Sequence, residues 1–189
     1  MNSVLVVSSS EQGTELLSQL LNANAHSAIT TAASCGEARR MLGNFEYDLV
    51  IINAPLRDEL GDSLAVAVTE ISTSGVIIIV KSEIADDISA KVDDYGVLVV
   101  SKPIIKHVFF QSMKLALASK KRITGLRNEN LHLQQKIEEI RLVTRAKCVL
   151  IQYLNMTESQ AHRYIEKQSM DMRTTREQIA LNILKTYET

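Results

Sequence analysis

The chain has 189 residues, 46% of them hydrophobic and 23% charged, which excludes a wholly disordered protein and leaves room for one large or two small domains. No apolar run approaches the roughly 20 residues that cross a bilayer, and the first residues lack the basic segment and cleavage site of a secretory signal. Cys35 and Cys148 are too few and too far apart for a disulfide framework, so we expect a cytoplasmic protein.

The near-neutral net charge conceals an asymmetry along the chain. Up to Ala118 there are 8 Lys and Arg against 14 Asp and Glu, whereas from Ser119 onward there are 13 against 8. Beyond Pro103 the only glycine or proline is Gly125, which is typical of helix. We therefore expect an acidic first module and a basic, helical second module that faces an anionic partner.

Five short runs rich in Val, Ile and Leu alternate with amphipathic segments in the first module. They cover residues 4–7, 28–32, 48–53, 75–80 and 97–100. Continuous apolar runs are typical of strands that are covered on both faces. The pattern predicts an α/β doubly wound, parallel five-stranded sheet, whose functional residues lie at the carboxyl ends of the strands.

The residues at those ends define a family resemblance. Ser8 and Ser9 follow the first strand, Asn53 ends the third, Ser82 follows the fourth, and Lys102 with the next proline follows the fifth. Over residues 1–118 this arrangement resembles a response-regulator receiver domain. The resemblance implies an acidic pair after the first strand that binds Mg²⁺, an Asp phosphoacceptor ending the third, and a Ser/Thr and a Lys that contact the phosphoryl group.

Two of these functions are missing from the sequence. Asn53 occupies the acceptor position and Ser8 and Ser9 the acidic positions, so there is neither a carboxylate nucleophile nor the carboxylates that Mg²⁺ prefers. We expect a pseudo-receiver that is not phosphorylated and holds no metal. Lys102 then either satisfies buried polar atoms or belongs to a pocket for another anion.

No spacing in the chain matches a hydrolase triad, a Walker loop or a metal cluster. We therefore expect no catalytic residues, no enzymatic activity and no cofactor.

A heptad pattern follows the first module over residues 119–143. Its apolar positions step by three and four and include one polar residue: Ile123, Leu126, Asn130, Leu133, Ile137 and Ile140. Ile at a, Leu at d and a lone Asn at a favour a parallel two-stranded coiled coil, and hence a homodimer. The alternative is a seam that packs on the C-terminal helices of the same chain.

The sequence pattern in the last part of the chain predicts three short helices. The first covers residues 144–154. The second follows Thr157 with Gln160, and the third follows Thr174 with Glu177, both in the spacing of a capping box.

Residues 135–189 resemble an ANTAR domain, the RNA-binding output module of antitermination regulators. The matching residues keep their order and spacing: Arg145-Ala146-Lys147, Leu150-Ile151, Thr157-Glu158, Ala161, Tyr164, Ser169-Met170, Thr174 and Ile179-Ala180. Ile151 replaces the usual Met, and His162 occupies the usual aromatic position after Ala161.

The resemblance implies that a dimer binds tandem stem-loops in a nascent mRNA leader, so that an overlapping terminator cannot form. Such readout targets unpaired loop bases while Lys and Arg neutralise phosphates. The candidate phosphate contacts are Arg145, Lys147, Arg163, Lys167, Arg173 and Arg176. The candidate base contacts are Tyr164, His162, Gln168 and Thr175.

Two other functions fit the residues. The first is a DNA-binding response regulator whose C-terminal helices form a helix-turn-helix variant. The second is an adaptor whose coiled coil docks a sensor protein. The first is disfavoured, because no densely basic recognition helix follows a short turn. Without an acceptor Asp, we expect regulation by a partner protein or by expression level.

Overall fold

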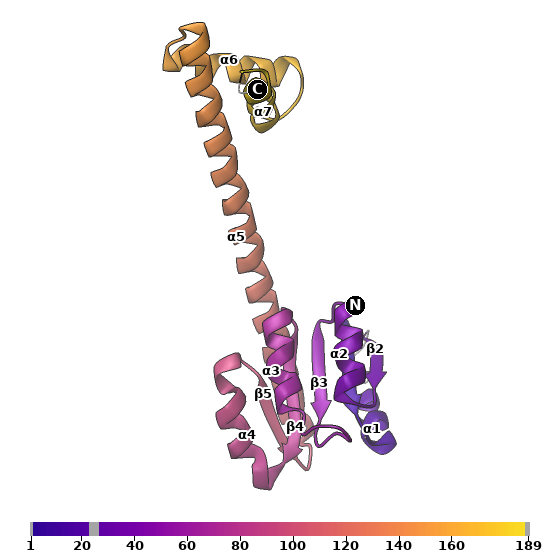
Figure 1. The fold of residues 1–189 in the computed structure, drawn as a ribbon. Helices are drawn as coiled ribbons and strands as arrows, with labels where there is room; N and C mark the ends of the chain where they lie inside the picture. The colour runs from indigo at the N-terminus through magenta and orange to yellow at the C-terminus, as the bar shows by residue number, and fades with distance from the viewer. Residues whose placement is uncertain (1, 23–26, 188–189) are drawn as a thin grey trace. The chain divides into compact units, whose positions relative to one another are not determined.

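A five-stranded parallel sheet forms the centre of the N-terminal part of the chain (Figure 1) in the computed structural model, which describes residues 2–22 and 27–187. The strand order is β2-β1-β3-β4-β5. The strands are β1 (Asn2–Ser8), β2 (Ser27–Ala32), β3 (Leu49–Asn53), β4 (Gly75–Lys81) and β5 (Leu98–Lys102). The chain divides into two compact units, Met1–Gly125 (unit 1) and Leu126–Thr189 (unit 2).

Helices cover both faces of this sheet, which confirms the predicted fold class. One face packs against α1 (Glu11–Asn22) and the first part of α5 (Lys106–Leu154). The other packs against α2 (Cys35–Asn44), α3 (Asp62–Ile71) and α4 (Ala85–Val92). Short 3₁₀ turns, η1 (Ser82–Ile84) and η2 (Asp93–Tyr95), flank α4. Alternate side chains of each strand enter opposite layers, so most residues of the three central strands β1, β3 and β4 are buried.

The sequence prediction of a separate helix over residues 144–154 is wrong. The structure has this stretch as the last turns of α5, which is 49 residues long. No glycine or proline interrupts residues 126–154, and the helix ends where Asn155 adopts a left-handed φ of 50°. Within the part of the chain that the structure describes, no helix is long and apolar enough to cross a membrane.

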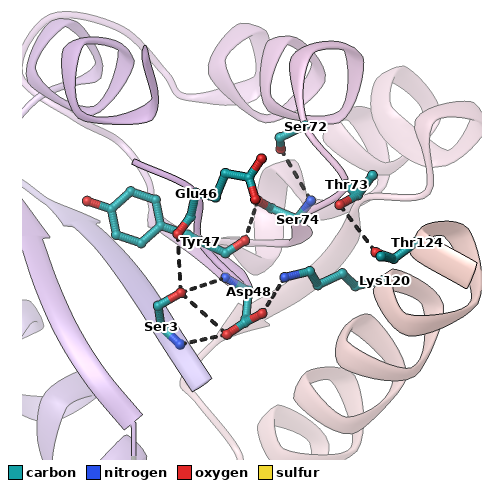
Figure 2. Close-up of polar contacts among 9 residues, drawn as sticks. All are labelled: Ser3, Glu46, Tyr47, Asp48, Ser72, Thr73, Ser74, Lys120 and Thr124. Carbon is teal, nitrogen blue, oxygen red and sulfur yellow. Dashed lines mark hydrogen bonds and ion pairs between the residues drawn. The ribbon is translucent and has the colours of Figure 1, made fainter. Parts of the chain in front are cut away.

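The first part of α5 is fixed to the sheet at the amino ends of β3 and β4 (Figure 2). A Cβ atom at Gly75 would lie 2.8 Å from the carbonyl oxygen of Ala116, so only glycine allows this close approach of α5 to β4. Farther along the helix, the ammonium of Lys120 pairs with the carboxylate of Asp48. This carboxylate also accepts the Ser3 backbone N–H at 2.8 Å. We call these contacts the α5 anchor.

In unit 2 the end of α5 packs on α6 (Glu158–Asp171) and α7 (Arg176–Tyr187). The core consists of Ala146, Val149, Leu150, Ala161, Ile165, Ile179, Ala180, Ile183 and Leu184. These side chains recur three or four positions apart, which places them on one face of each helix.

Of the two capping boxes that the sequence predicts in unit 2, the structure has one. The capping box at Thr157 is confirmed, since its hydroxyl accepts from Gln160 N–H while the Gln160 side chain accepts from Thr157 N–H. The predicted cap at Thr174 is wrong. The next residue, Thr175, accepts the N–H of Gln178 at 3.2 Å and caps α7.

Candidate functional site

At the carboxyl edge of the sheet, strand pairing places Ser8 opposite Asn53. The Asn53 amide donates to the Ser8 hydroxyl at 3.0 Å, and that hydroxyl donates to the Ser10 carbonyl at 3.1 Å. The other amide atom, Oδ1 of Asn53, is buried and has no hydrogen-bond partner among the described residues. The edge therefore holds an amide–hydroxyl pair where the receiver resemblance implies a phosphoacceptor and a metal.

The first turn of α1 closes this edge. A Cβ atom at Gly13 would lie 2.9 Å from the Ser8 hydroxyl and would collide with the amide nitrogen of Asn53. The glycine brings the backbone of α1 onto these side chains, of which Ser8 is buried and Asn53 is half-buried.

The other remnants of the resemblance make backbone contacts. Lys102 donates to the carbonyl of Ala54 at 2.5 Å, and burial, together with the nearby charge of Lys81, lowers the pKa of this ammonium. Ser82 donates to the Lys102 carbonyl at 2.6 Å, and Ser9 donates to the Pro55 carbonyl at 3.3 Å. None of these three side chains bonds to Asn53 in the described residues.

In unit 2 the structure brings three of the predicted RNA-binding residues together. Lys147, His162 and Arg176 line a groove of about 220 Å³ beside the α5 residues Lys136, Glu139, Ile140, Val143 and Thr144. We call this the basic groove. Three lysine or arginine cations surround an apolar floor there, against one carboxylate.

Carboxylates already pair with two of these cations. Lys147 donates to Glu158 at 2.7 Å, and this hydrogen bond lowers the pKa of the Glu158 carboxyl. Arg176 lies 3.3 Å from a carboxylate oxygen of Glu139. An anionic ligand in the groove would compete with both internal pairs.

Other predicted contacts lie on a different side of α6. Arg163 and Lys167 are exposed on its outer surface, and Tyr164 is 38% exposed. Because two positions turn a helix by about 200°, Tyr164 and His162 flank opposite sides of the core-facing strip. The two candidate stacking residues therefore do not share one site.

The remaining predicted contacts are spread over three places. Arg173 is exposed in the α6–α7 turn with a left-handed φ of 51°. Thr175 caps α7, and Gln168 is half-buried on α6. Arg145 lines a second groove, between α5 and α7.

Sequence reasoning did not include Lys136 among the candidate RNA contacts. A signal existed, because Lys136, Ile140 and Lys147 follow helical spacing on one face. Glu139 and Glu158 gave no comparable signal, since their pairing depends on how α6 and α7 fold back on α5.

The predicted coiled-coil residues are exposed and belong to none of the three hydrophobic cores of the described residues. The exposed fractions of Ile123, Leu126, Leu133, Ile137 and Ile140 range from 49% to 59%. Among the described residues, the seam side chains are absent from the core that α5 forms with α6 and α7.

One group of potential metal ligands occurs among the described residues: Cys35, Asp58 and Glu59. Asp58 accepts the N–H groups of Cys35 and Gly36 at 3.0 and 2.9 Å, at the start of α2. Burial and the nearby acidic groups raise the pKa of the Cys35 thiol to about 11. These side chains thus serve the helix start, and a protonated thiol is a poor metal ligand.

Comparisons with known proteins agree with this division of the chain. Residues 131–184 match the model of the ANTAR domain. The transcriptional regulatory protein PdtaR of Mycobacterium tuberculosis, in strains CDC 1551 / Oshkosh and H37Rv, is 27% identical over 92% of this chain and 84% of its own length.

Solved structures resemble unit 1. The signal receiver domain of an HD domain-containing protein from Pseudomonas fluorescens Pf-5 has a TM-score of 0.59 at 23% identity, over 66% of this chain and 92% of its own. A response regulator receiver domain protein from Clostridium thermocellum has a TM-score of 0.58 at 19% identity, over 65% and 99%. The chain therefore joins a unit with the response-regulator receiver fold to a C-terminal ANTAR domain.

Proposed function

We propose that this protein is a transcription regulator that acts as an RNA-binding antiterminator. A dimer binds tandem stem-loops in nascent mRNA leaders and prevents a terminator from forming. The ANTAR match over residues 131–184 is the observation that carries the proposal, and the name of the relative PdtaR supports a role in transcriptional regulation.

The charges of unit 2 support RNA as the ligand. Phosphates gain affinity from clustered cations, and unpaired loop bases stack on aromatic or imidazole rings. The basic groove offers Lys136, Lys147 and Arg176 with His162 at its wall. Tyr164, Arg163 and Lys167 on the other side of α6 supply a second set of contacts, suited to a neighbouring part of a stem-loop.

In this proposal, the signal that controls the protein's activity does not act through phosphorylation of the receiver-like unit. An amide replaces the nucleophilic carboxylate at Asn53, its nitrogen is bonded to Ser8, and α1 covers both at Gly13. Regulation then comes from a partner protein or from expression level.

The exposed heptad seam supports dimerisation. Five large apolar side chains remain about half exposed along one side of α5, around Asn130. A single Asn at an a position favours a two-stranded, in-register pair. Two paired chains present two ANTAR domains to two stem-loops.

A salt-titrated binding assay without any phosphodonor tests the proposal. The full chain is mixed with tandem-hairpin RNAs selected from a loop-randomised pool, with scrambled single-stranded RNA and with duplex DNA. We expect tight binding to hairpins alone. Preference for duplex DNA would instead indicate a DNA-binding regulator, and weak, salt-sensitive binding to all three would indicate an adaptor.

A phosphodonor assay tests the input separately. Incubation with acetyl phosphate and Mg²⁺ should add no phosphoryl group detectable by mass spectrometry, and Asn53→Asp should not restore labelling because the Mg²⁺ carboxylates are also missing. Labelling of the wild-type chain at the strand ends would contradict this part of the proposal.

A further inference from the structure

The first part of α5 carries an exposed apolar stripe that the sheet does not use. Phe109 and Ala116 are buried against the sheet, whereas Ile105, the residue just before the helix, is 62% exposed, and Val108 and Leu115 on the helix are 41% and 59% exposed. Large exposed apolar side chains that recur on one face of a helix are typical of an interaction surface.

The spacing of this stripe continues into the predicted seam. The positions step by three or four throughout: Ile105, Val108, Ser112, Leu115, Ser119, Ile123, Leu126, Asn130, Leu133, Ile137 and Ile140. The only irregularity is two successive steps of four, from Leu115 to Ser119 to Ile123, which is the stutter that coiled coils tolerate by local unwinding. Ile123, the first residue of the predicted seam, is itself 49% exposed and belongs to unit 1.

We infer that α5 of unit 1 pairs with α5 of a second copy of this chain, so that the dimer interface includes Ile105, Val108 and Leu115 as well as the predicted seam. This inference rests on the dimer of the proposed function and adds the receiver-like unit to its interface.

The length of the seam favours a second copy as the occupant. Residues 123–140 span roughly two and a half heptads, fewer than the three to four that a coiled coil usually needs. Residues 105–140 span about five heptads, which exceeds that requirement. The apolar positions of two identical helices have the same spacing, so two copies can pair along this stretch about a twofold axis, as a symmetric dimer requires.

The α5 anchor holds this stripe outward. The close approach of Gly75 to Ala116 and the ion pair of Lys120 with Asp48 belong to this anchor. The hydrogen bond between the hydroxyls of Thr124 and Thr73, at 3.4 Å, lies on the same side of the helix as that ion pair (Figure 2). The stutter at 115–123 coincides with these contacts. A helix fixed on one side presents its other side in a defined orientation to a partner.

Charge substitutions on the stripe test the inference in the full-length chain by sedimentation equilibrium. Val108→Glu and Leu115→Glu should each weaken dimerisation at least tenfold, because a carboxylate would enter an apolar interface. His107→Glu is the matched control, since His107 is exposed but about 100° away from Val108 on the helix. It should leave the dimer unchanged, and circular dichroism of every variant checks folding.

Leu133→Glu distinguishes this inference from the proposed dimer itself. If Leu133→Glu produces monomers while both stripe variants dimerise as the wild type does, the stripe inference is wrong and the dimer stands. A monomeric wild type would overturn both.

Disulfide trapping gives a second, independent readout. In a Cys148→Ser background, Ser119→Cys should crosslink two chains on mild oxidation, because an in-register pair places this position against its own copy. His107→Cys should not crosslink. Equal crosslinking of both variants, or of neither, would contradict an in-register α5 pair.

Discussion

Arg173 occupies a backbone position that usually belongs to glycine. It follows α6 with φ 51°, while Thr174 donates its N–H to the Ser169 carbonyl and Arg173 donates to that of Met170. This is the Schellman pattern, in which the left-handed residue is usually glycine because a Cβ atom is unfavourable in that conformation. A left-handed arginine costs about 1 kcal/mol, which is consistent with selection for its guanidinium rather than for stability.

Arg173→Gly should therefore stabilise unit 2 by about 1 kcal/mol relative to Arg173→Ala, because both lack the guanidinium and only alanine keeps the Cβ. Both variants should lose RNA affinity. Urea unfolding and RNA titration measure the two effects. Equal stability of the two variants would contradict the energetic cost assigned to a left-handed residue with a Cβ atom at position 173.

Glu139 restrains the basic groove through its pair with Arg176. Glu139→Gln should raise RNA affinity about two- to fivefold at low salt, since phosphate no longer competes with a carboxylate for the guanidinium. Glu138→Gln is the control, because it makes the same change of charge but pairs only with Arg141 among the described residues, at 3.8 Å. The same gain from both would indicate a general field effect rather than release of Arg176.

At the level of elements, the caps of α6 and α7 allow the cap expected from sequence spacing to be compared with the cap that the structure has. Thr157→Ala and Thr175→Ala should each lower the free energy of unfolding by about 1 kcal/mol, because each hydroxyl caps a helix start. Thr174→Ala should change it by less than about half as much, although Thr174 with Glu177 also has the sequence spacing of a capping box. A larger loss at Thr174 than at Thr175 in urea unfolding would contradict the observed cap.

The attachment of α5 to the sheet has a pH dependence with a definite sign. Burial alone would raise the pKa of Asp48, but hydrogen bonds from Lys120 and Ser3 outweigh it, so this pKa lies below its ordinary value. The carboxylate thus stabilises the fold above its ordinary pKa, and the stabilisation is lost as pH falls through the lowered value.

Asp48→Asn should cost about 1–2 kcal/mol at neutral pH and progressively less in acid, until both proteins are equally stable. Asp62→Asn is the control, since its lysine partner Lys91 lies 3.5 Å away and is largely exposed. Urea unfolding across the acid range measures both. A difference for Asp48→Asn that persists or grows in acid would contradict the assignment.

Much of the fold follows from local patterns in the sequence. The five apolar runs specify buried parallel strands, and Asn53 and Ser8 meet because strand ends of a doubly wound sheet share one edge. The sequence does not specify the closure by Gly13 or the pairing of Glu139 with Arg176, since both depend on how helices pack. Nor did helical spacing alone reveal that Thr175, not Thr174, caps α7.

At the scale of the whole molecule, a chain without an acceptor carboxylate retains the receiver fold. Asn53, whose Oδ1 atom is buried, lies at one edge of its sheet, while the opposite ends of β3 and β4 hold α5 through Asp48 and Gly75. In this account the receiver-like unit contributes a scaffold for dimerisation, and the basic ANTAR unit contributes the nucleic-acid surface.

Single-round transcription in vitro tests the central claim most directly. The template carries a tandem-hairpin leader, selected by binding, that overlaps an intrinsic terminator, and no phosphodonor is present. The account predicts that the wild-type chain increases readthrough in a concentration-dependent way, and that Arg176→Gln and Leu133→Glu each abolish the increase. Unchanged termination despite hairpin binding, or readthrough that appears only after acetyl phosphate is added, would contradict it.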